Sequence, residues 1–116
     1  MDPALAYLAR CLVLTVAIEV SAAFALGVRS PRDVLVVALA QVLTNPPVAY
    51  AASWIGWSAS ASAGVWTAVI ALELAAVAVE AFVYRFRLGE NCPWAARPLA
   101  LSALLNALSF AAGFVL

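Results

Sequence analysis

Four carboxyl and amide side chains stand inside long apolar stretches of this sequence, where they could bind a proton or a cation. They are Glu19, Asn45, Glu73 and Asn106. Inserting a charged side chain at the centre of a bilayer costs about 2.5–3.5 kcal/mol even on the hydrophobicity scale that gives the lowest cost, the one based on membrane insertion. Residues of this kind therefore usually have a function. With a rise of ~1.5 Å per helical residue, all four lie ~13–18 Å from the nearest charged connector. The sequence therefore predicts that they share one level of a membrane.

Each of these residues also belongs to a polar stripe along its own apolar stretch. Thr15 precedes Glu19 by four residues, and Gln41 precedes Asn45 by the same interval. Residues four apart lie on one face of a helix, so the stripes predict a common polar interior. No basic residue shares this level, so Glu19 and Glu73 are either protonated or paired with a metal ion or an organic cation. The predicted proton- or cation-binding residues are Glu19, Asn45, Glu73, Asn106, Thr15 and Gln41.

A structural interpretation of the polar residues stands beside this one. Glu80 lies ~7 Å from the level of Arg85, so we expect its side chain to reach Arg85, Arg87 or Arg29 and to stabilise the fold. Interhelical hydrogen bonds in membranes contribute ~0.6 kcal/mol on average, and the polar stripe of the last apolar stretch could do no more than that. The expected structural residues are Thr44, Pro46, Pro47, Glu80, Arg85, Ser102 and Ser109.

The composition places these residues in a membrane protein. Of 116 residues, 67% are hydrophobic and 10% are charged, with a mean hydropathy of +1.06. A soluble domain is about 25% charged. Net charge is zero, so no basic face is expected for nucleic acid. Without histidine or paired cysteines, we expect neither a metal site nor a cofactor nor an enzyme.

Four apolar stretches are each near the ~20 residues that span a bilayer, at about 4–28, 34–57, 65–88 and 98–116. Three short connectors join them, so neighbouring stretches must run antiparallel. The predicted fold is all-α: a single transmembrane domain over 1–116, built as an up-down four-helix bundle. Polar residues would face its interior and apolar residues its exterior.

Asn45-Pro46-Pro47 predicts a kink or a break in the second helix. Proline has no N–H and clashes with the preceding turn, so the carbonyls near Val42 and Leu43 lose their donors. Thr44 and Asn45 are the nearest groups that could satisfy them. Two interpretations stay open: a purely structural kink, or a broken helix whose freed groups line a site.

Arginine predicts the orientation. Five of the six arginines lie in or next to the first and third connectors, which the positive-inside rule assigns to the cytoplasm, so both termini face outward. Aromatic residues are expected at the outer interface (Trp54, Trp57 and Trp66) and at the inner one (Tyr84, Phe86 and Trp94). Cys11 and Cys92 then lie on opposite sides of the membrane and form no disulfide within one chain.

Two resemblances extend this interpretation. "LTVAIEV" and "VAYAASW" resemble the small multidrug resistance transporters, in which the glutamate of the first span carries protons or cationic drugs, a role that would fall on Glu19. This chain adds Glu73 and Glu80 to that pattern. "LTNP", "LELAAVAVEAFVYR" and "LSALLNALSFAAG" together look more like small bacterial membrane proteins of uncharacterised function with a TNP signature.

The sequence therefore predicts a multi-pass protein of the bacterial inner membrane. We expect a proton- or cation-linked transporter or transporter subunit, working as a homodimer or in a larger membrane complex. The alternative is a scaffold or accessory subunit whose polar residues only fix helix packing, and an intramembrane enzyme ranks last.

Overall fold

The computed structural model describes residues 2–58 and 60–112. Four helices account for most of this part of the chain: α1 (Pro3–Ala25), α2 (Pro31–Trp54), α3 (Ala63–Arg87) and α4 (Pro98–Ala112). The predicted all-α fold and its four helices are confirmed. The end of the fourth predicted span, 113–116, lies outside the described residues.

Local signals in the sequence set the helix ends. The Asp2 carboxylate accepts a hydrogen bond of 2.8 Å from the Ala4 N–H and caps α1, with proline at the first helical position. Ser62 caps α3 in the same way, through the Val65 N–H at 3.4 Å. Just beyond α1 and α2, Gly27 (φ 105°) and Gly56 (φ 76°) adopt the left-handed conformation that glycine tolerates best.

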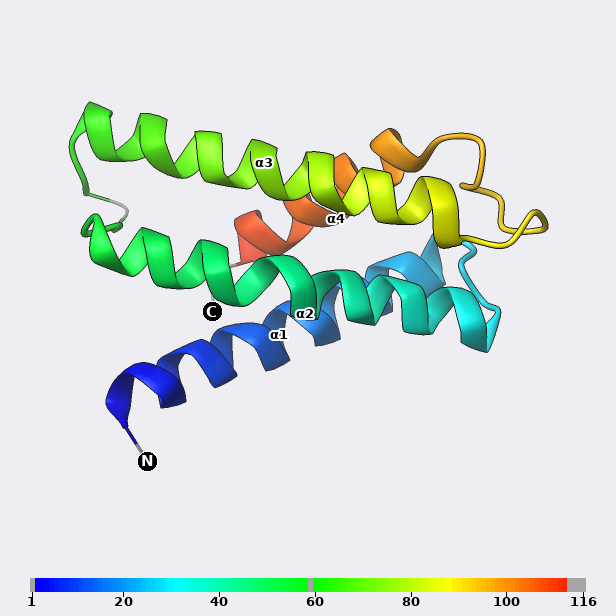
Figure 1. Ribbon diagram of the computed structural model, residues 1–116, viewed down its shortest axis with the longest axis horizontal. Helices are drawn as coiled ribbons and strands as arrows, with labels where there is room; N and C mark the ends of the chain where they lie inside the picture. The colour runs from blue at the N-terminus through cyan, green and yellow to red at the C-terminus, as the bar shows by residue number, and fades with distance from the viewer. Residues whose placement is uncertain (1, 59, 113–116) are drawn as a thin grey trace.

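The helices form a ring in chain order, running alternately up and down (Figure 1). Within the described residues α1 packs against α2 and α4, and α3 packs against the same two helices. The connectors 26–30 and 88–97 lie at one end of the bundle. Residues 55–58 and 60–62, the start of α1 and the end of α4 lie toward the other end. This arrangement makes any polar face turned inward meet faces from the other helices.

Polar side chains are buried and large apolar side chains are exposed, which is the reverse of a soluble protein. The buried polar and charged residues include Glu19, Asp33, Gln41, Thr44, Glu80, Ser102 and Asn106, whereas large apolar side chains such as Leu39, Leu74 and Phe82 are more than half exposed. Helices α1, α2 and α3 are long and apolar enough to cross a membrane, and α4 is a shorter apolar helix. Apolar surface on this scale needs a partner less polar than water. The chain is therefore a membrane protein.

Helix α2 continues without interruption through Pro46 and Pro47, so the predicted break does not occur. The kink stays a prediction. Thr44 and Asn45 also do not bind the carbonyls that the prolines release. The Thr44 hydroxyl contacts the Ala40 carbonyl, and the Asn45 amide donates to Thr15 on α1. Thr44 thus bonds one turn back within α2, and Asn45 bonds to a neighbouring helix.

Two side-chain contacts join the arginine-bearing connectors. Trp94 Nε1 donates to the Leu26 carbonyl at 2.9 Å, and the Gly89 N–H donates to the buried Asp33 carboxylate at 2.9 Å. These contacts hold the start of α2 against the end of α3. They consequently fix the relative height of the polar residues on the two helices.

Replacing Asp33 with alanine should lower the free energy of unfolding by about 1–3 kcal/mol, because the Gly89 N–H loses its acceptor in a partly buried position. Denaturant-induced unfolding in detergent micelles, followed by circular dichroism, measures this loss. Asp33→Asn is the matched control, since its amide oxygen can still accept the bond. Equal stability of the parent and the alanine variant would contradict the role of the contact.

Candidate functional site

Glu80 is the centre of the polar interior. Its side chain is 1% exposed, and it accepts hydrogen bonds from two neighbouring helices. Gln41 Nε2 of α2 donates to Oε1 at 2.6 Å, and Asn106 Nδ2 of α4 donates to the same oxygen at 3.2 Å. Thr44 Oγ1 of α2 lies 2.9 Å from Oε2. Glu80, Gln41, Thr44 and Asn106 are called the Glu80 cluster below.

Helical spacing builds this cluster. Gln41 and Thr44 are three residues apart on α2, which turns both toward α3. On α4, Ser102 and Asn106 are four apart, and the two are also linked because Asn106 Nδ2 donates to the Ser102 carbonyl at 2.8 Å. The Ser102 hydroxyl donates to the Val77 carbonyl of α3 at 2.8 Å. Helix α4 is thereby held at the height where Asn106 meets Glu80.

The prediction that Glu80 pairs with an arginine is wrong. Its hydrogen-bond partners come from α2 and α4, and Arg85 instead lies over the Phe86 ring, 5.5 Å from the ring centroid. The physical reason is the helix period: Glu80 and Tyr84 share the buried face of α3, whereas Arg85 lies one residue further round. Arg29 similarly lies over Phe24, 4.7 Å from its centroid.

Tyr84 corrects a second expectation. It is fully buried and therefore does not belong to an aromatic belt at the inner interface. Its hydroxyl oxygen lies 3.5 Å from Gln41 Nε2, so it borders the Glu80 cluster. At the other end of the bundle, Trp57 and Trp66 pack edge to face, with ring centroids 4.5 Å apart, and Phe110 joins them. Trp54 is 74% exposed, as a belt residue would be.

Glu19 of α1 is as deeply buried as Glu80, at 1% exposure, but its two carboxyl oxygens do not both have hydrogen-bond partners. Its Oε1 has no hydrogen-bond partner among the described residues. Ser109 of α4 interacts with its carboxyl group, and Glu80 and Glu73 lie close enough for their charges to repel its own. A buried carboxyl oxygen without a partner is costly, so this atom is suited to a proton or another ligand.

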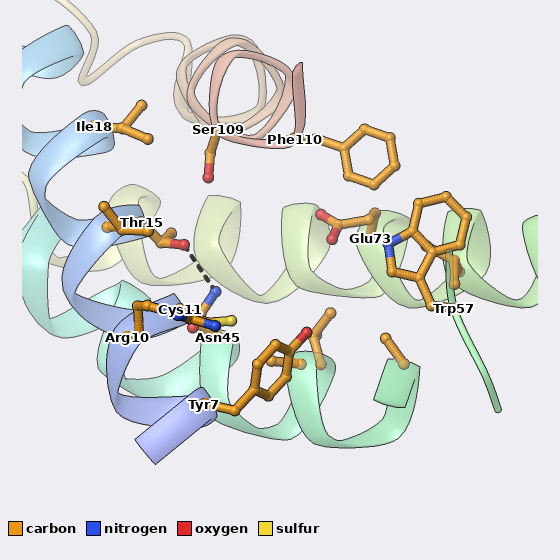
Figure 2. A pocket seen from close by; sticks show the side chains of 15 residues that line it. Tyr7, Arg10, Cys11, Thr15, Ile18, Asn45, Trp57, Glu73, Ser109 and Phe110 are labelled. Atoms are coloured by element: carbon orange, nitrogen blue, oxygen red, sulfur yellow. Dashed lines mark hydrogen bonds between the residues drawn. The ribbon is translucent and has the colours of Figure 1, made fainter. Parts of the chain in front are cut away.

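A cleft of about 620 Å³ with Glu73 in its wall opens in the half of the bundle that holds the start of α1 (Figure 2). Its polar lining includes Arg10, Thr15, Asn45, Glu73 and Ser109, and aromatic side chains line it as well: Tyr7, Trp57 and Phe110. Asn45 Nδ2 donates to Thr15 Oγ1 at 3.1 Å, which closes α2 against α1. Asn45 Oδ1 has no partner among the described residues.

The structure thus divides the predicted proton- or cation-binding residues between two places. Thr15, Asn45 and Glu73 line the cleft, whereas Gln41 and Asn106 bind Glu80. Glu19 is electrostatically coupled to both carboxylates. Sequence reasoning missed Glu80 as the centre of the interior. The available signal was the helical spacing, since Glu80 and Tyr84 are four residues apart on α3 and Gln41 and Thr44 are three apart on α2, which places each pair on one helix face.

The residues that surround the carboxylates set what this interior can bind. The neighbours of Glu80 and Glu19 are amides, hydroxyls and other carboxylates, and the Glu80 cluster contains no basic residue. Among the described residues, no group of three or more His, Cys, Asp or Glu side chains is arranged to hold a metal ion. No protein-family model, curated protein or solved structure matches the chain. The geometry alone therefore carries the functional argument.

Asn106→Leu should destabilise the protein by about 1–3 kcal/mol, because Glu80 Oε1 loses one of its two donors inside the bundle. The reversible unfolding of the purified protein in mixed micelles measures this change. Ala107→Leu adds the same side chain at an exposed neighbouring position and serves as the control. If both substitutions have the same small effect, Asn106 does not contribute to the cluster as described.

Proposed function

We propose that this chain is a proton- or cation-linked transporter, or a subunit of one, in the bacterial inner membrane. One observation carries the proposal: Glu19 and Glu80 are buried to 1% exposure inside the bundle, and their partners among the described residues are amides, hydroxyls and other carboxylates. A charge placed there is costly, and amides would hold helices together without that cost. The carboxyl groups are explained if they take up and release a positive charge.

The cleft supports transport over a purely structural role. Glu73 is half-buried, lines the cleft and is electrostatically coupled to Glu80 as well as to Glu19. A cation that enters the cleft therefore meets the Glu73 carboxylate and the Arg10 side chain in its wall, and Glu73 is close enough to interact with Glu19 and Glu80. Membrane transporters place their ion-coupling groups in such buried, cavity-linked positions.

We also propose that the chain works as a homodimer or within a larger membrane complex. Four short helices leave little room for a bundle to open alternately to both sides. A partner helix against the bundle would provide a second element to move against.

A scaffold or accessory subunit is the second candidate, and the Glu80 cluster itself favours it. The bonds from Gln41, Thr44 and Asn106 join α3 to α2 and α4, which is what a structural polar cluster does. In that case the carboxyl group would act only as an acceptor. Glutamine at position 80 could then replace it without loss.

Purified protein in liposomes should conduct protons or small cations, and Glu19→Gln, Glu73→Gln and Glu80→Gln should each reduce that flux to the level of protein-free vesicles. The amide keeps the shape of the side chain but cannot bind and release a proton. A pH-sensitive dye inside the vesicles measures proton flux, and Glu90→Gln, at an exposed connector position, is the control.

The same flux measurement distinguishes the transporter from the scaffold. Flux that is unchanged in all three buried variants excludes the transport proposal. If these variants also fold and assemble as the parent does, the scaffold is favoured.

Both termini are proposed to face outward, which places the cleft on the outer side of the membrane. Cys11 lines the cleft, whereas Cys92 is buried in the connector at the other end. A membrane-impermeant maleimide added to spheroplasts should therefore label Cys92→Ser protein at Cys11, and Cys11→Ser protein should stay unlabelled. Labelling of Cys11 only in inside-out vesicles would reverse the proposed orientation.

A further inference from the structure

The Thr44 hydroxyl is shared between two oxygen atoms. Its Oγ1 lies 3.0 Å from the Ala40 carbonyl oxygen and 2.9 Å from Glu80 Oε2. A hydroxyl group has one hydrogen to donate and two lone pairs with which to accept. When Glu80 is ionised, the single Thr44 hydrogen must serve two acceptors. When Glu80 carries a proton on Oε2, that proton is donated to Thr44, and the Thr44 hydrogen is free for Ala40.

The other carboxyl oxygen is fixed as an acceptor. Oε1 receives bonds from two amide nitrogens, those of Gln41 and Asn106. The orientation of the Asn106 amide is determined by its surroundings, because Nδ2 faces two acceptors, Glu80 Oε1 and the Ser102 carbonyl. With its lone pairs already engaged, Oε1 has no place for a hydrogen. Oε2 is consequently the oxygen to which a proton can add.

The same bonds disfavour a metal ion at Glu80. A hard cation takes six or more oxygen ligands, each of which must turn a lone pair toward it. Here the partners of Glu80 turn donor hydrogens toward the carboxyl group, and the side chain is 1% exposed. A proton needs only one lone pair on Oε2 and no change in the position of any heavier atom.

We propose that Glu80 Oε2 is a reversible proton-binding site and that the Thr44 hydroxyl is the switch that accommodates both states. Uptake forms one O–H bond between Oε2 and a proton supplied by solvent, and the Thr44 hydrogen rotates from Oε2 to the Ala40 carbonyl. Release breaks that bond and reverses the rotation. Each cycle binds and frees one positive charge, and no electrons are exchanged. The inference rests on the proposed function and narrows its substrate to the proton.

The titratable groups around Glu80 come from α1 and α3. They are Glu19, Glu73 and Tyr84, whose hydroxyl interacts with the Glu80 carboxyl group, whereas the described residues of α2 and α4 present amides and hydroxyls to it. Glu19 is buried and has an oxygen without a partner, which makes it the neighbour suited to exchange a proton with Glu80. Glu73 lines the cleft and can take that proton from solvent.

Infrared difference spectroscopy of the reconstituted protein tests the site directly, through the C=O stretch of a protonated carboxyl group. A pH change should produce such bands from the buried carboxyl groups, and Glu80→Gln should remove one of them, which we call the Glu80 band, while Glu19→Gln and Glu73→Gln leave that band in place. Thr44→Val keeps the shape of the side chain but removes the hydroxyl, so it should shift the frequency of the band and lower proton flux about tenfold, since one hydrogen bond to the carboxyl group is lost. Thr44→Ser keeps the hydroxyl and should leave both unchanged.

Each outcome has a separate meaning. A set of pH-dependent bands that Glu80→Gln leaves complete, or no such band in the parent at any pH, overturns the proton site. A band that Thr44→Val does not shift overturns the role of the hydroxyl. Loss of flux in Glu19→Gln and Glu73→Gln with no Glu80 band leaves the transport proposal intact and removes this inference alone. A Glu80 band in a protein that shows no flux overturns the transport proposal and leaves the proton-binding site intact. If Thr44→Val does not fold, the parent, Glu80→Gln and Thr44→Ser still decide where the proton binds.

Discussion

The structure depends on one constraint: a carboxyl group inside a bilayer must find its hydrogen bonds within the protein. Glu80 finds them on two other helices, through Gln41, Thr44 and Asn106. Leaving such a group without partners costs several kcal/mol, more than a typical interhelical hydrogen bond contributes. The three partners therefore act less by adding stability than by making other helix registers costly. Any slip of α2 or α4 along α3 would leave a buried polar atom bare.

This requirement explains features far from the cluster. The Asp33–Gly89 contact and the Trp94–Leu26 contact set the height of the helices at one end of the bundle. The packing of Trp57, Trp66 and Phe110 sets it at the other. The apolar exterior cannot do so, because lipid contacts Leu39 equally well at any height. In this bundle, polar and aromatic contacts fix the register of the helices.

The sequence predicted the helices well because apolar length and capping residues are local properties. It also placed polar groups inside, since membrane composition requires that. Glu80 was misassigned because its depth suggested an arginine partner, whereas the face of α3 on which it lies is set by the helix period. Of the predicted kink or break at Pro46-Pro47, the break does not occur, for a related reason. Packing of α2 against its neighbours keeps the chain helical where local preference would interrupt it.

The two buried carboxyl groups, those of Glu19 and Glu80, differ in their hydrogen-bond partners, and this difference bears on function. Glu80 is surrounded by donors, which suit a charge, whereas Glu19 keeps a bare oxygen, which suits a proton. A cluster evolved only to join helices would be satisfied at both positions. Placing an unsatisfied acid beside a satisfied one creates two unequal positions for a single proton. Glu73 lies at the cleft wall, so under the transport proposal a proton reaches these two positions from the cleft.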